Sequence, residues 1–594
     1  MSELLTANDK RTKYCGEFRE SDVGKRVCVM GWAQRQRDLG SLIFIDLRDR
    51  TGLVQLAFDE TTDKAIFDSA FGIRAEYVLC AHGTVRIRSS INKNIPTGMV
   101  EILVDELKIL SAAQTPPFEI IEDSAVKPEL RLKHRYLDLR RPDLQRNIMA
   151  RSEISAIARR YFKEQGFVDI ETPSLIKPTP EGARDYIVPS RVHKGNFYAL
   201  PQSPQLYKQL LMLSGFDRYF QIAHCFRDED LRADRQPEFT QIDLEMSFVT
   251  QDDVIAVVEG FLATLFREFK GIELKLPLRR LTYAEAMARF GSDKPDLRFG
   301  MELCDLSDIA RGCGFKVFAG AVENGGSVRG IVAKNAADKL SRKELDALGE
   351  YVKSYRAKGL AWYKNNGGEV TSSYAKFLTD SENAAIAVKL GIEPGDVAFI
   401  VADKDAVVFD ALGALRCELA RRLGLIKKDV YELLWVTDFP LLEYSEEDGR
   451  YYAKHHPFTM PNADDIPLLE SDPGKVRSIA YDIVLNGSEA GGGSIRIHTR
   501  EIQNKMFRAL GLSEEEAEEK FGFLLEAFKY GTPPHGGLAF GLDRLVALLL
   551  GLDDIRDVIA FPKVQNASEL MTMCPSPTDE KALAELGIAV VERE

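Results

Sequence analysis

The sequence predicts an α+β protein of several domains, with an N-terminal β-barrel and a larger region of strands and helices that a further α+β domain interrupts. The chain of 594 residues is too long for one hydrophobic core. Residues 14–110 contain five short apolar runs separated by glycine-containing turns, which is typical of a small all-β domain. Residues 219–246 contain two apolar runs on either side of a charged loop, which predicts two buried strands.

Composition and charge limit the classes of function. Hydrophobic residues make up 45% and charged residues 28% of the chain, as is usual for a globular protein. The net charge of -13 argues against non-specific nucleic-acid binding but leaves binding through local basic patches open. The 8 cysteines include no C-x-x-C pair, which argues against a disulfide framework or a zinc ribbon. No apolar run is long enough for a signal peptide or a membrane span, so we expect a cytoplasmic protein with no membrane partner.

The apolar runs of the N-terminal region fit an OB-fold barrel, with strands at residues 27–33, 42–46, 53–58, 77–85 and 100–110. Strand alternation that turns Ile43 and Ile45 inward places Phe44 on the exposed face, and the next strand exposes Gln55 in the same way. An outward ring beside an outward amide forms a stacking platform with a hydrogen-bonding edge for nucleic-acid bases. Positive charge for phosphates comes from Arg35, Arg37, Arg48 and Arg50. The alternative is an exposed aromatic side chain with no role.

Residues 113–146 are predicted to form a hinge. Pro116 and Pro117 interrupt regular structure, and the segment that follows is the most basic of the chain, with arginine or lysine at positions 131, 133, 135, 140, 141 and 146. The segment is either a connector held by surface salt bridges or a patch that guides a nucleic-acid stem.

Residues 151–165 are predicted to form an amphipathic helix, because apolar residues recur at helical spacing from Ile154 to Phe162. Gly166 ends this helix, and residues 167–172 are predicted to form a strand that stops at Pro173. A second helix is expected near Pro204, where polar residues precede the helix start and suit a small zwitterion.

The charged loop between the two strands of residues 219–246 is the most informative stretch. Its charged residues include the arginines Arg227, Arg232 and Arg235 and the acids Asp228, Glu229 and Asp230. Guanidinium groups at this density suit a polyanion such as a nucleoside triphosphate. The alternative is a solvated hairpin tip, because charge runs usually lie at the surface.

The string F-R-D-E followed by R-x-x-x-F in residues 226–239 resembles motif 2 of class II aminoacyl-tRNA synthetases, and the longer string resembles the bacterial aspartyl-tRNA synthetase family. This resemblance implies an antiparallel catalytic sheet flanked by helices. It divides the chain into an anticodon-binding barrel (1–112), the hinge (113–146), two catalytic halves (147–296 and 431–565), an inserted bacterial-type α+β domain (297–430) and a C-terminal extension (566–594). The helix and strand of residues 151–172 resemble motif 1, which implies a homodimer.

No residue pattern in the inserted domain indicates a catalytic or binding function. Gly-rich turns at residues 312–314 and 325–326 and a helix near residues 342–358 predict a separate α+β unit, in which Trp362 is expected to lie in the core.

The second catalytic half contains four further candidate residues. Asp482, on a predicted strand, and Glu489 are expected to hold Mg²⁺ on nucleotide phosphates, since hard cations prefer carboxylate oxygens. Arg496 lies on a strand whose other face is apolar, and a guanidinium there suits bidentate capture of a carboxylate, although a structural arginine is the alternative. Arg544 falls in the first turn of a buried helix, where a cation is unfavourable unless an anion binds. The G-L-D-R string around it resembles motif 3.

The resemblance also implies a role for individual residues. Catalysis is assigned to Arg227, Glu229 and Arg544. Aspartate binding is assigned to Glu181, Ser203, Gln205, Lys208, Arg227, Asp243, His455 and Arg496. ATP binding is assigned to Arg227, Asp228, Glu229, Gln236, Glu489, Gly541, Leu542, Asp543 and Arg544. Mg²⁺ is assigned to Asp482 and Glu489, and the tRNA anticodon to Arg37, Leu39, Phe44 and Gln55.

The implied reaction is the ATP-dependent activation of L-aspartate and its transfer to tRNA-Asp. Leu39 is the residue found in relatives that charge tRNA-Asp alone, whereas relatives that also charge tRNA-Asn tend to carry histidine at this point. We therefore expect discrimination against tRNA-Asn, with an enzyme that charges both tRNAs as the alternative. An asparagine-forming amide ligase that uses no tRNA and a catalytically inactive tRNA-binding paralogue remain open as further alternatives.

Overall fold

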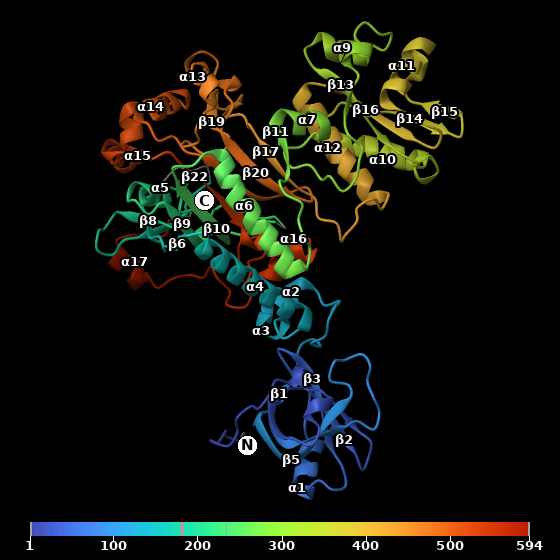
Figure 1. The fold of residues 1–594 in the computed structure, drawn as a ribbon, viewed down its shortest axis with the longest axis vertical. Coiled ribbons are helices and arrows are strands. Elements are labelled where there is room, and N and C mark those ends of the chain that lie inside the picture. The colour runs from blue at the N-terminus through green and yellow to red at the C-terminus, as the bar shows by residue number, and fades with distance from the viewer. Residues whose placement is uncertain (1–2, 179–182, 233, 592–594) are drawn as a thin grey trace. The chain divides into compact units, whose positions relative to one another are not determined.

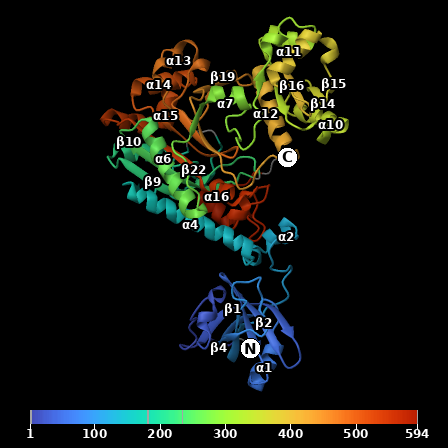
Figure 2. The same ribbon diagram turned by 45° about the vertical axis from the view of Figure 1, so that its right-hand side comes forward.

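The computed structural model describes residues 3–178, 183–232 and 234–591, and the chain divides into two compact units (Figures 1 and 2). The first unit comprises Met1–Ser152 and Arg556–Pro577, and the second comprises Glu153–Ile555 and Thr578–Glu594. Residues 556–565, which the sequence assigns to the catalytic region, therefore lie in the unit that contains the barrel. No helix in the described ranges is both long enough and apolar enough to cross a bilayer.

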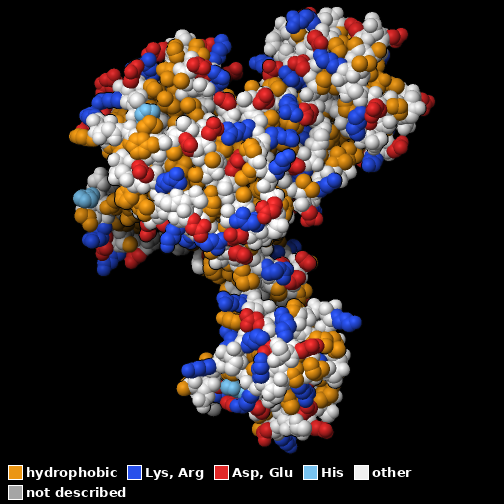
Figure 3. All heavy atoms as spheres, in the orientation of Figure 1, with side chains coloured by type: hydrophobic (Ala, Val, Ile, Leu, Met, Phe, Trp, Pro, Cys, Tyr) orange, Lys and Arg blue, Asp and Glu red, His pale blue; other side chains and the backbone are white. Residues whose placement is uncertain are grey.

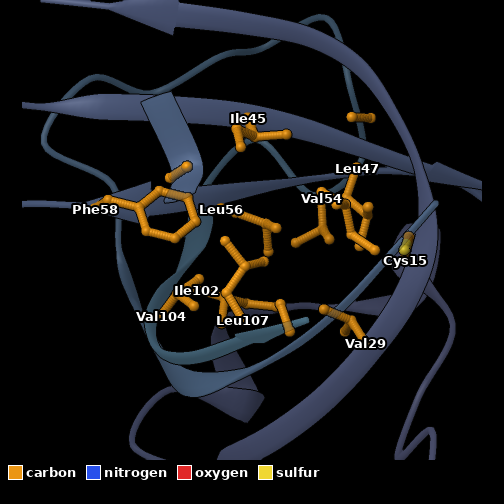
Figure 4. Packing of buried hydrophobic residues seen from close by; sticks show 14 of the residues in the cluster. Cys15, Val29, Ile45, Leu47, Val54, Leu56, Phe58, Ile102, Val104 and Leu107 are labelled. Atoms are coloured by element: carbon orange, nitrogen blue, oxygen red, sulfur yellow. The ribbon is translucent and has the colours of Figure 1, made fainter. Parts of the chain in front are cut away.

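The N-terminal strands close into a five-stranded barrel in the order β1-β2-β3-β5-β4, which confirms the predicted fold. The strands are β1 (Arg26–Asp38), β2 (Ile43–Asp49), β3 (Gly52–Phe58), β4 (Val78–Ile87) and β5 (Val100–Ser111), with α1 (Lys64–Phe71) between β3 and β4. Inward-facing side chains such as Val29, Ile45 and Val54 fill the barrel core (Figure 4). Alternation along the strands thus sets which residues reach the outer surface.

The basic segment after the barrel folds into two short helices, α2 (Pro128–Lys133) and α3 (Arg135–Asp138). The carboxylate of Asp138 is buried and pairs with Arg135 at 2.7 Å and with Arg141 at 3.0 Å. Arg135 also donates to the backbone oxygens of Arg556 and Ile559. The charges of Arg135 and Arg141 are paired with groups of the same unit, which favours the connector interpretation over a nucleic-acid patch.

Basic and acidic side chains are interspersed over the face shown in Figure 3.

The second unit contains an eight-stranded sheet in the order β11-β17-β20-β21-β22-β10-β9-β6. Its strands are β6 (Val168–Asp169), β9 (Arg218–Phe226), β10 (Glu238–Ser247), β11 (Arg279–Thr282), β17 (Leu433–Thr437), β20 (Ala480–Leu485), β21 (Ser488–Ile495) and β22 (His535–Gly541). The six central strands are antiparallel as expected, whereas both edge pairs, β11–β17 and β6–β9, are parallel. The strand predicted at residues 167–172 is reduced to the two residues of β6 that pair with β9.

Helices cover both faces of this sheet. On one face, Phe261 of α6 packs edge-on against Phe540 of β22. On the other face, Lys208 of α5 bonds Asp243 of β10. The larger helices of the unit are α4 (Pro142–Glu164), α5 (Gln205–Leu213), α6 (Gln251–Leu265), α7 (Tyr283–Phe290), α14 (Arg500–Ala509), α15 (Glu514–Ala527), α16 (Leu542–Leu550) and α17 (Glu580–Leu586). The predicted apolar stripe of α4, from Ile154 to Phe162, is buried.

The inserted domain has its own five-stranded sheet in the order β12-β13-β16-β14-β15. The strands are β12 (Cys304–Asp305), β13 (Ser327–Ala333), β14 (Ala361–Asn366), β15 (Glu369–Ser372) and β16 (Val397–Asp403). The helices are α8 (Ser307–Ala310), α9 (Lys316–Glu323), α10 (Arg342–Lys353), α11 (Asp380–Leu390) and α12 (Asp405–Arg422). Trp362 lies in the domain core, as expected.

Candidate active site

Two adjoining cavities lie at the end of the β9–β10 hairpin. The first has a volume of 390 Å³ and the second a volume of 570 Å³, and Arg227, Glu229 and His455 line both. Predicted nucleotide and metal residues that line the first cavity are Gln236, Asp482, Glu489, Gly541, Asp543 and Arg544. Asp228 lines the second. Leu542 is an exception: its side chain is buried in the core and lines neither cavity.

Arg227 is placed by the loop that follows β9. Its backbone N–H donates to the oxygen of Pro237 at 2.9 Å, and its guanidinium lies 5.0 Å from the centre of the Phe239 ring. The adjacent Asp228 is tied to Arg184 by a backbone hydrogen bond of 3.0 Å, and Glu229 pairs with Arg235. The loop thus presents Arg227 to both cavities, while Glu229 holds Arg235.

The first turn of α16 is joined to β10 and β21. Asp543 accepts a hydrogen bond of 2.9 Å from the backbone of Thr240. Arg544 donates to the backbone oxygen of Glu489 at 3.0 Å and to Asp234 at 3.3 Å. These bonds hold the Arg544 guanidinium at the wall of the first cavity. Arg227 lines the same cavity, although it is distant from Arg544 in the sequence.

The carboxylates of Asp482 and Glu489 lie together beside Gly492. A Cβ atom at Gly492 would be 2.6 Å from Asp482 Oδ1 and 3.6 Å from Glu489 Oε1, so only glycine leaves room for this pair. Burial and the charge of Asp482 raise the pKa of Glu489. Asp482 Oδ1 is buried without a hydrogen-bond partner. A buried carboxylate pair with an unused oxygen fits a divalent hard cation such as Mg²⁺.

Behind the cavity wall lies a cluster of four buried charges. Lys208 Nζ is 2.7 Å from Asp243 Oδ1 and 3.2 Å from Glu245 Oε2. Arg496 donates from Nε and Nη2 to the two oxygens of Glu245, at 2.9 and 3.1 Å. Burial raises the pKa of Asp243, whereas the cations Arg496 and Lys208 outweigh burial at Glu245 and lower its pKa to about 2. Glu245 therefore occupies the Nε–Nη2 edge of Arg496, and the predicted capture of a substrate carboxylate cannot use that edge.

His456 connects this cluster to the cavity. Its ring lines the cavity, and its Nε2 lies 2.5 Å from Nη1 of Arg496. Its Nδ1 lies 3.2 Å from the backbone N–H of Phe458, which is also a donor. Burial and the nearby Arg496 cation hold the pKa of His456 well below its usual range. A neutral imidazole has only one acceptor nitrogen, so it can accept from Arg496 or from Phe458 but not from both.

The other predicted aspartate residues lie around the start of α5. The backbone N–H of Gln205 donates to Ser203 Oγ at 3.4 Å, and the buried side-chain nitrogen of Gln205 has no partner. Asp243 Oδ2 is likewise buried without a partner. Glu181 lies outside the described residues. Glu245 and His456 were missed by sequence reasoning, although Glu245 stands two residues after Asp243 on a strand and His456 directly follows His455.

The proposed anticodon residues gather on the outer surface of the barrel. Arg37 stands opposite Phe44 in the β1–β2 pair, and its guanidinium lies 5.7 Å from the Phe44 ring. Leu39, in the turn that follows, is 67% exposed. The predicted exposure of Gln55 is wrong: Gln55 is 4% exposed, because it bonds Arg37, Arg88 and Glu101.

Arg48 also differs from its predicted role as a phosphate contact. Its guanidinium is buried and donates to both oxygens of Glu76, at 2.7 and 2.8 Å. The charge of Arg48 is therefore neutralised within the barrel, and Arg35, Arg37 and Arg50 remain at the surface or partly exposed.

Comparison with known proteins places these features in a family. Residues 127–565 match the model of class II tRNA synthetases (D, K and N), and residues 27–110 match the model of the OB-fold nucleic acid binding domain. The chain is 60% identical to the aspartate–tRNA ligase of Ruminiclostridium cellulolyticum and 59% identical to the aspartate–tRNA(Asp/Asn) ligase of Lachnoclostridium phytofermentans, in each case over 98% of both chains. Among solved structures, the aspartyl-tRNA synthetase of Entamoeba histolytica has a TM-score of 0.58 at 21% identity, covering 94% of this chain and 92% of that chain.

Proposed function

This chain belongs to the class II tRNA synthetases of the D, K and N group, and we propose that within it the chain acts as an aspartate–tRNA ligase that activates L-aspartate with ATP and transfers it to the 3′ end of tRNA-Asp. The observation that carries this proposal is one cavity lined by Arg227, Arg544 and the carboxylates of Asp482 and Glu489. Two cations and a site for a divalent cation match the charge of a nucleoside triphosphate. The buried cluster behind His456 supplies paired charges for a small zwitterion.

The first step needs no general base. The substrate's α-carboxylate is ionised at neutral pH and is itself the nucleophile that attacks the α-phosphorus of ATP. Arg227, which lines both cavities, is placed to bridge the α-phosphate and the aspartate. Arg544 holds the far end of the triphosphate, where negative charge accumulates on the leaving pyrophosphate. Mg²⁺ held by Asp482 and Glu489 would supply further charge neutralisation of the phosphates.

Aspartate binding follows from the unsatisfied groups around α5. Asp243 Oδ2, buried and without a partner, is the acceptor available to the substrate's ammonium group. The side-chain carboxylate binds Arg496 through Nη1, in the place of His456, whose neutral ring is a poor partner there. Asparagine is rejected because a neutral amide in this position leaves the guanidinium without an anion.

Transfer to tRNA requires recognition outside the catalytic cavity. The ring of Phe44 and the side chain of Arg37 form the platform that we assign to the anticodon, and the buried Gln55 accepts a hydrogen bond from Arg37 and so helps to position it. Leu39, exposed beside it, offers no hydrogen bond to a wrong base and favours tRNA-Asp over tRNA-Asn. An enzyme that charges both tRNAs is the second candidate, because relatives at similar identity carry both names.

We also infer a homodimer in a reducing cytoplasm. The segment after β6 exposes large apolar side chains, among them Leu175, Ile187, Val192 and Phe197. Exposed apolar side chains gathered in one segment favour a protein interface. All eight cysteines are free, which agrees with a reducing compartment. Sedimentation equilibrium at micromolar concentration tests the dimer, and a monomer mass at all concentrations would contradict it.

The proposed reaction is tested by aspartate-dependent ATP–pyrophosphate exchange, measured with and without tRNA, followed by aminoacylation of purified tRNA-Asp. Exchange without tRNA together with charging of tRNA-Asp is the expected result. Formation of free asparagine would instead support the amide ligase, and tRNA binding without exchange would support an inactive paralogue.

A further inference from the structure

Three side chains with metal-binding atoms meet on the barrel, in a different unit from the catalytic cavity. They are Cys28 on β1 and Cys80 and His82 on β4, two strands that pair with Cys28 opposite His82. The neighbouring residues Val29 and Ala81 belong to the barrel core; Figure 4 shows Val29 there. Because successive side chains alternate between the two faces of a strand, Cys28, Cys80 and His82 project from the outer face.

These outward side chains are nevertheless buried. Cys28 is 2% exposed, Cys80 is 0% exposed and His82 is 8% exposed. The N-terminal segment lies against them, and the backbone N–H of Thr12 donates to the oxygen of Cys28 at 3.0 Å. From this segment Asp9, itself 7% exposed, reaches the cluster.

The carboxylate of Asp9 is oriented by its other contacts. Its Oδ2 accepts from Thr6 Oγ1 at 2.7 Å and from Lys108 Nζ at 2.8 Å. Its Oδ1 is thereby directed at the cluster, 2.9 Å from His82 Nε2 and 3.9 Å from Cys80 Sγ. Two sulfurs and one imidazole thus lie within reach of one another, and the Asp9 carboxylate oxygen borders His82 and Cys80.

The spacing of the two sulfurs matches a shared metal ion. Cys28 Sγ and Cys80 Sγ are 3.7 Å apart, and one ligand atom from each of Cys28, Cys80 and His82 lies within 4.8 Å of the others. Two thiolates bound to tetrahedral zinc at about 2.3 Å stand about 3.8 Å apart. A disulfide would require the sulfurs to approach to about 2.05 Å. The geometry therefore suits a bridging metal ion better than a covalent bond.

We propose that Cys28, Cys80, His82 and Asp9 form a structural site for Zn²⁺. Binding replaces the two thiol protons, which pass to solvent, while His82 binds through a ring nitrogen that carries no proton and Asp9 binds as a carboxylate. The ion would join the N-terminal segment to β1 and β4. Sequence spacing gave no signal for this site, since its ligands are distant in the chain.

The test uses the full chain, reduced and stripped of metal with a chelator. Titration with Co²⁺ is expected to produce an intense thiolate-to-cobalt charge-transfer band that saturates at one equivalent and that Zn²⁺ abolishes. Cobalt bound at Asp482 and Glu489 gives no such band, because those ligands are oxygens. Cys28→Ser and Cys80→Ser are expected to lose the band, whereas Cys304→Ser, a control in the inserted domain, should keep it.

Two further measurements on the native chain test the site without depending on whether a variant folds. One equivalent of Zn²⁺ is expected to raise the Tm of the barrel and to protect Cys28 and Cys80 from alkylation, mapped by peptide mass spectrometry. No charge-transfer band in the reduced native chain, or a band that survives in a folded Cys28→Ser/Cys80→Ser variant, would overturn the proposal. So would alkylation of both cysteines at an unchanged rate in zinc, or conversion of the pair to a disulfide with no metal uptake.

Discussion

Arg496 donates two hydrogen bonds to Glu245, from Nε at 2.9 Å and from Nη2 at 3.1 Å, and both residues are buried. The pair fixes the guanidinium so that Nη1, which contacts His456, is the part nearest the cavity. The cation that we propose to select aspartate therefore already has one anion, and removal of Arg496 has two separable effects.

Arg496→Leu is expected to raise the KM for aspartate sharply and to narrow the preference over asparagine. It also leaves Glu245 buried without its main partner, which costs about 3–5 kcal/mol of stability. The double variant Arg496→Leu/Glu245→Gln should recover stability, measured by denaturant unfolding, but not aspartate affinity. If the folded double variant kept its preference for aspartate, the selecting cation would be Lys208 instead.

Arg227→Ala is expected to abolish aspartate-dependent ATP–pyrophosphate exchange while the fold is retained. The loss of one fixed donor at the reacting phosphate costs at least about 2.7 kcal/mol, or roughly 100-fold in rate. Arg267→Ala, which removes an exposed arginine that does not line the cavity, is the matched control. Near-normal exchange in a folded Arg227→Ala variant would falsify the assignment of the charged loop.

Gly492→Ala is expected to weaken the response of exchange to Mg²⁺. The new methyl group would lie 2.6 Å from Asp482 Oδ1 and would push that carboxylate away from Glu489. Partial rescue at high Mg²⁺ should distinguish lost metal affinity from a damaged sheet. Gly349→Ala, where an added Cβ meets nothing within 4 Å, should leave the Mg²⁺ dependence unchanged. An unaltered Mg²⁺ dependence in Gly492→Ala would show that the carboxylate pair does not hold the ion.

Phe44→Ala is expected to spare tRNA-independent exchange and to reduce aminoacylation by about 1–3 kcal/mol for a lost base stack. Phe71→Ala removes an exposed ring from the same barrel and serves as the control. Gln55→Ala should behave differently, because it removes the hydrogen-bond partner of the buried Arg88 Nη2 and of Glu101 Oε2 and lowers stability by about 1–3 kcal/mol. If Phe44→Ala reduced ATP–pyrophosphate exchange and aminoacylation equally, Phe44 would act in folding rather than in tRNA binding.

Purified tRNA-Asn is expected to be charged with radiolabelled aspartate far more slowly than tRNA-Asp. The two tRNAs differ at one anticodon base, and a single base misfit is worth a few kcal/mol at most, so one residue such as Leu39 can decide the preference. Leu39→His should reduce the difference in charging rate between tRNA-Asp and tRNA-Asn. Comparable rates for both in the native chain would make it an aspartate–tRNA(Asp/Asn) ligase.

Much of the fold could be predicted because local signals agreed with the tertiary structure. Apolar alternation located the barrel strands and the β9–β10 pair, and helical periodicity located the buried stripe of α4. Residues that meet in the cavity were found through the strings around Arg227 and Arg544, which mark the end of β9 and the start of α16.

The side chains whose burial was not predicted depend on contacts that strand alternation does not encode. Gln55 and Arg48 face outward on the barrel, but Arg88, Glu101 and Glu76 cover them. Strand alternation places Glu245 on the polar face of β10, yet α5 covers that face as well. Side-chain direction is local, whereas burial on the outer surface of a sheet is set by distant segments.

The parallel pairing of β11 with β17 has a consequence for how the gene can change. Adjacent parallel strands must be joined by a crossover, and here the crossover is the whole of residues 283–432, including the inserted domain. Any shorter crossover that joined the same two edge strands would preserve the strand order of the catalytic sheet. The lineage of this chain could thus gain, lose or exchange the insertion without re-threading the strands that hold Asp243 and Asp482.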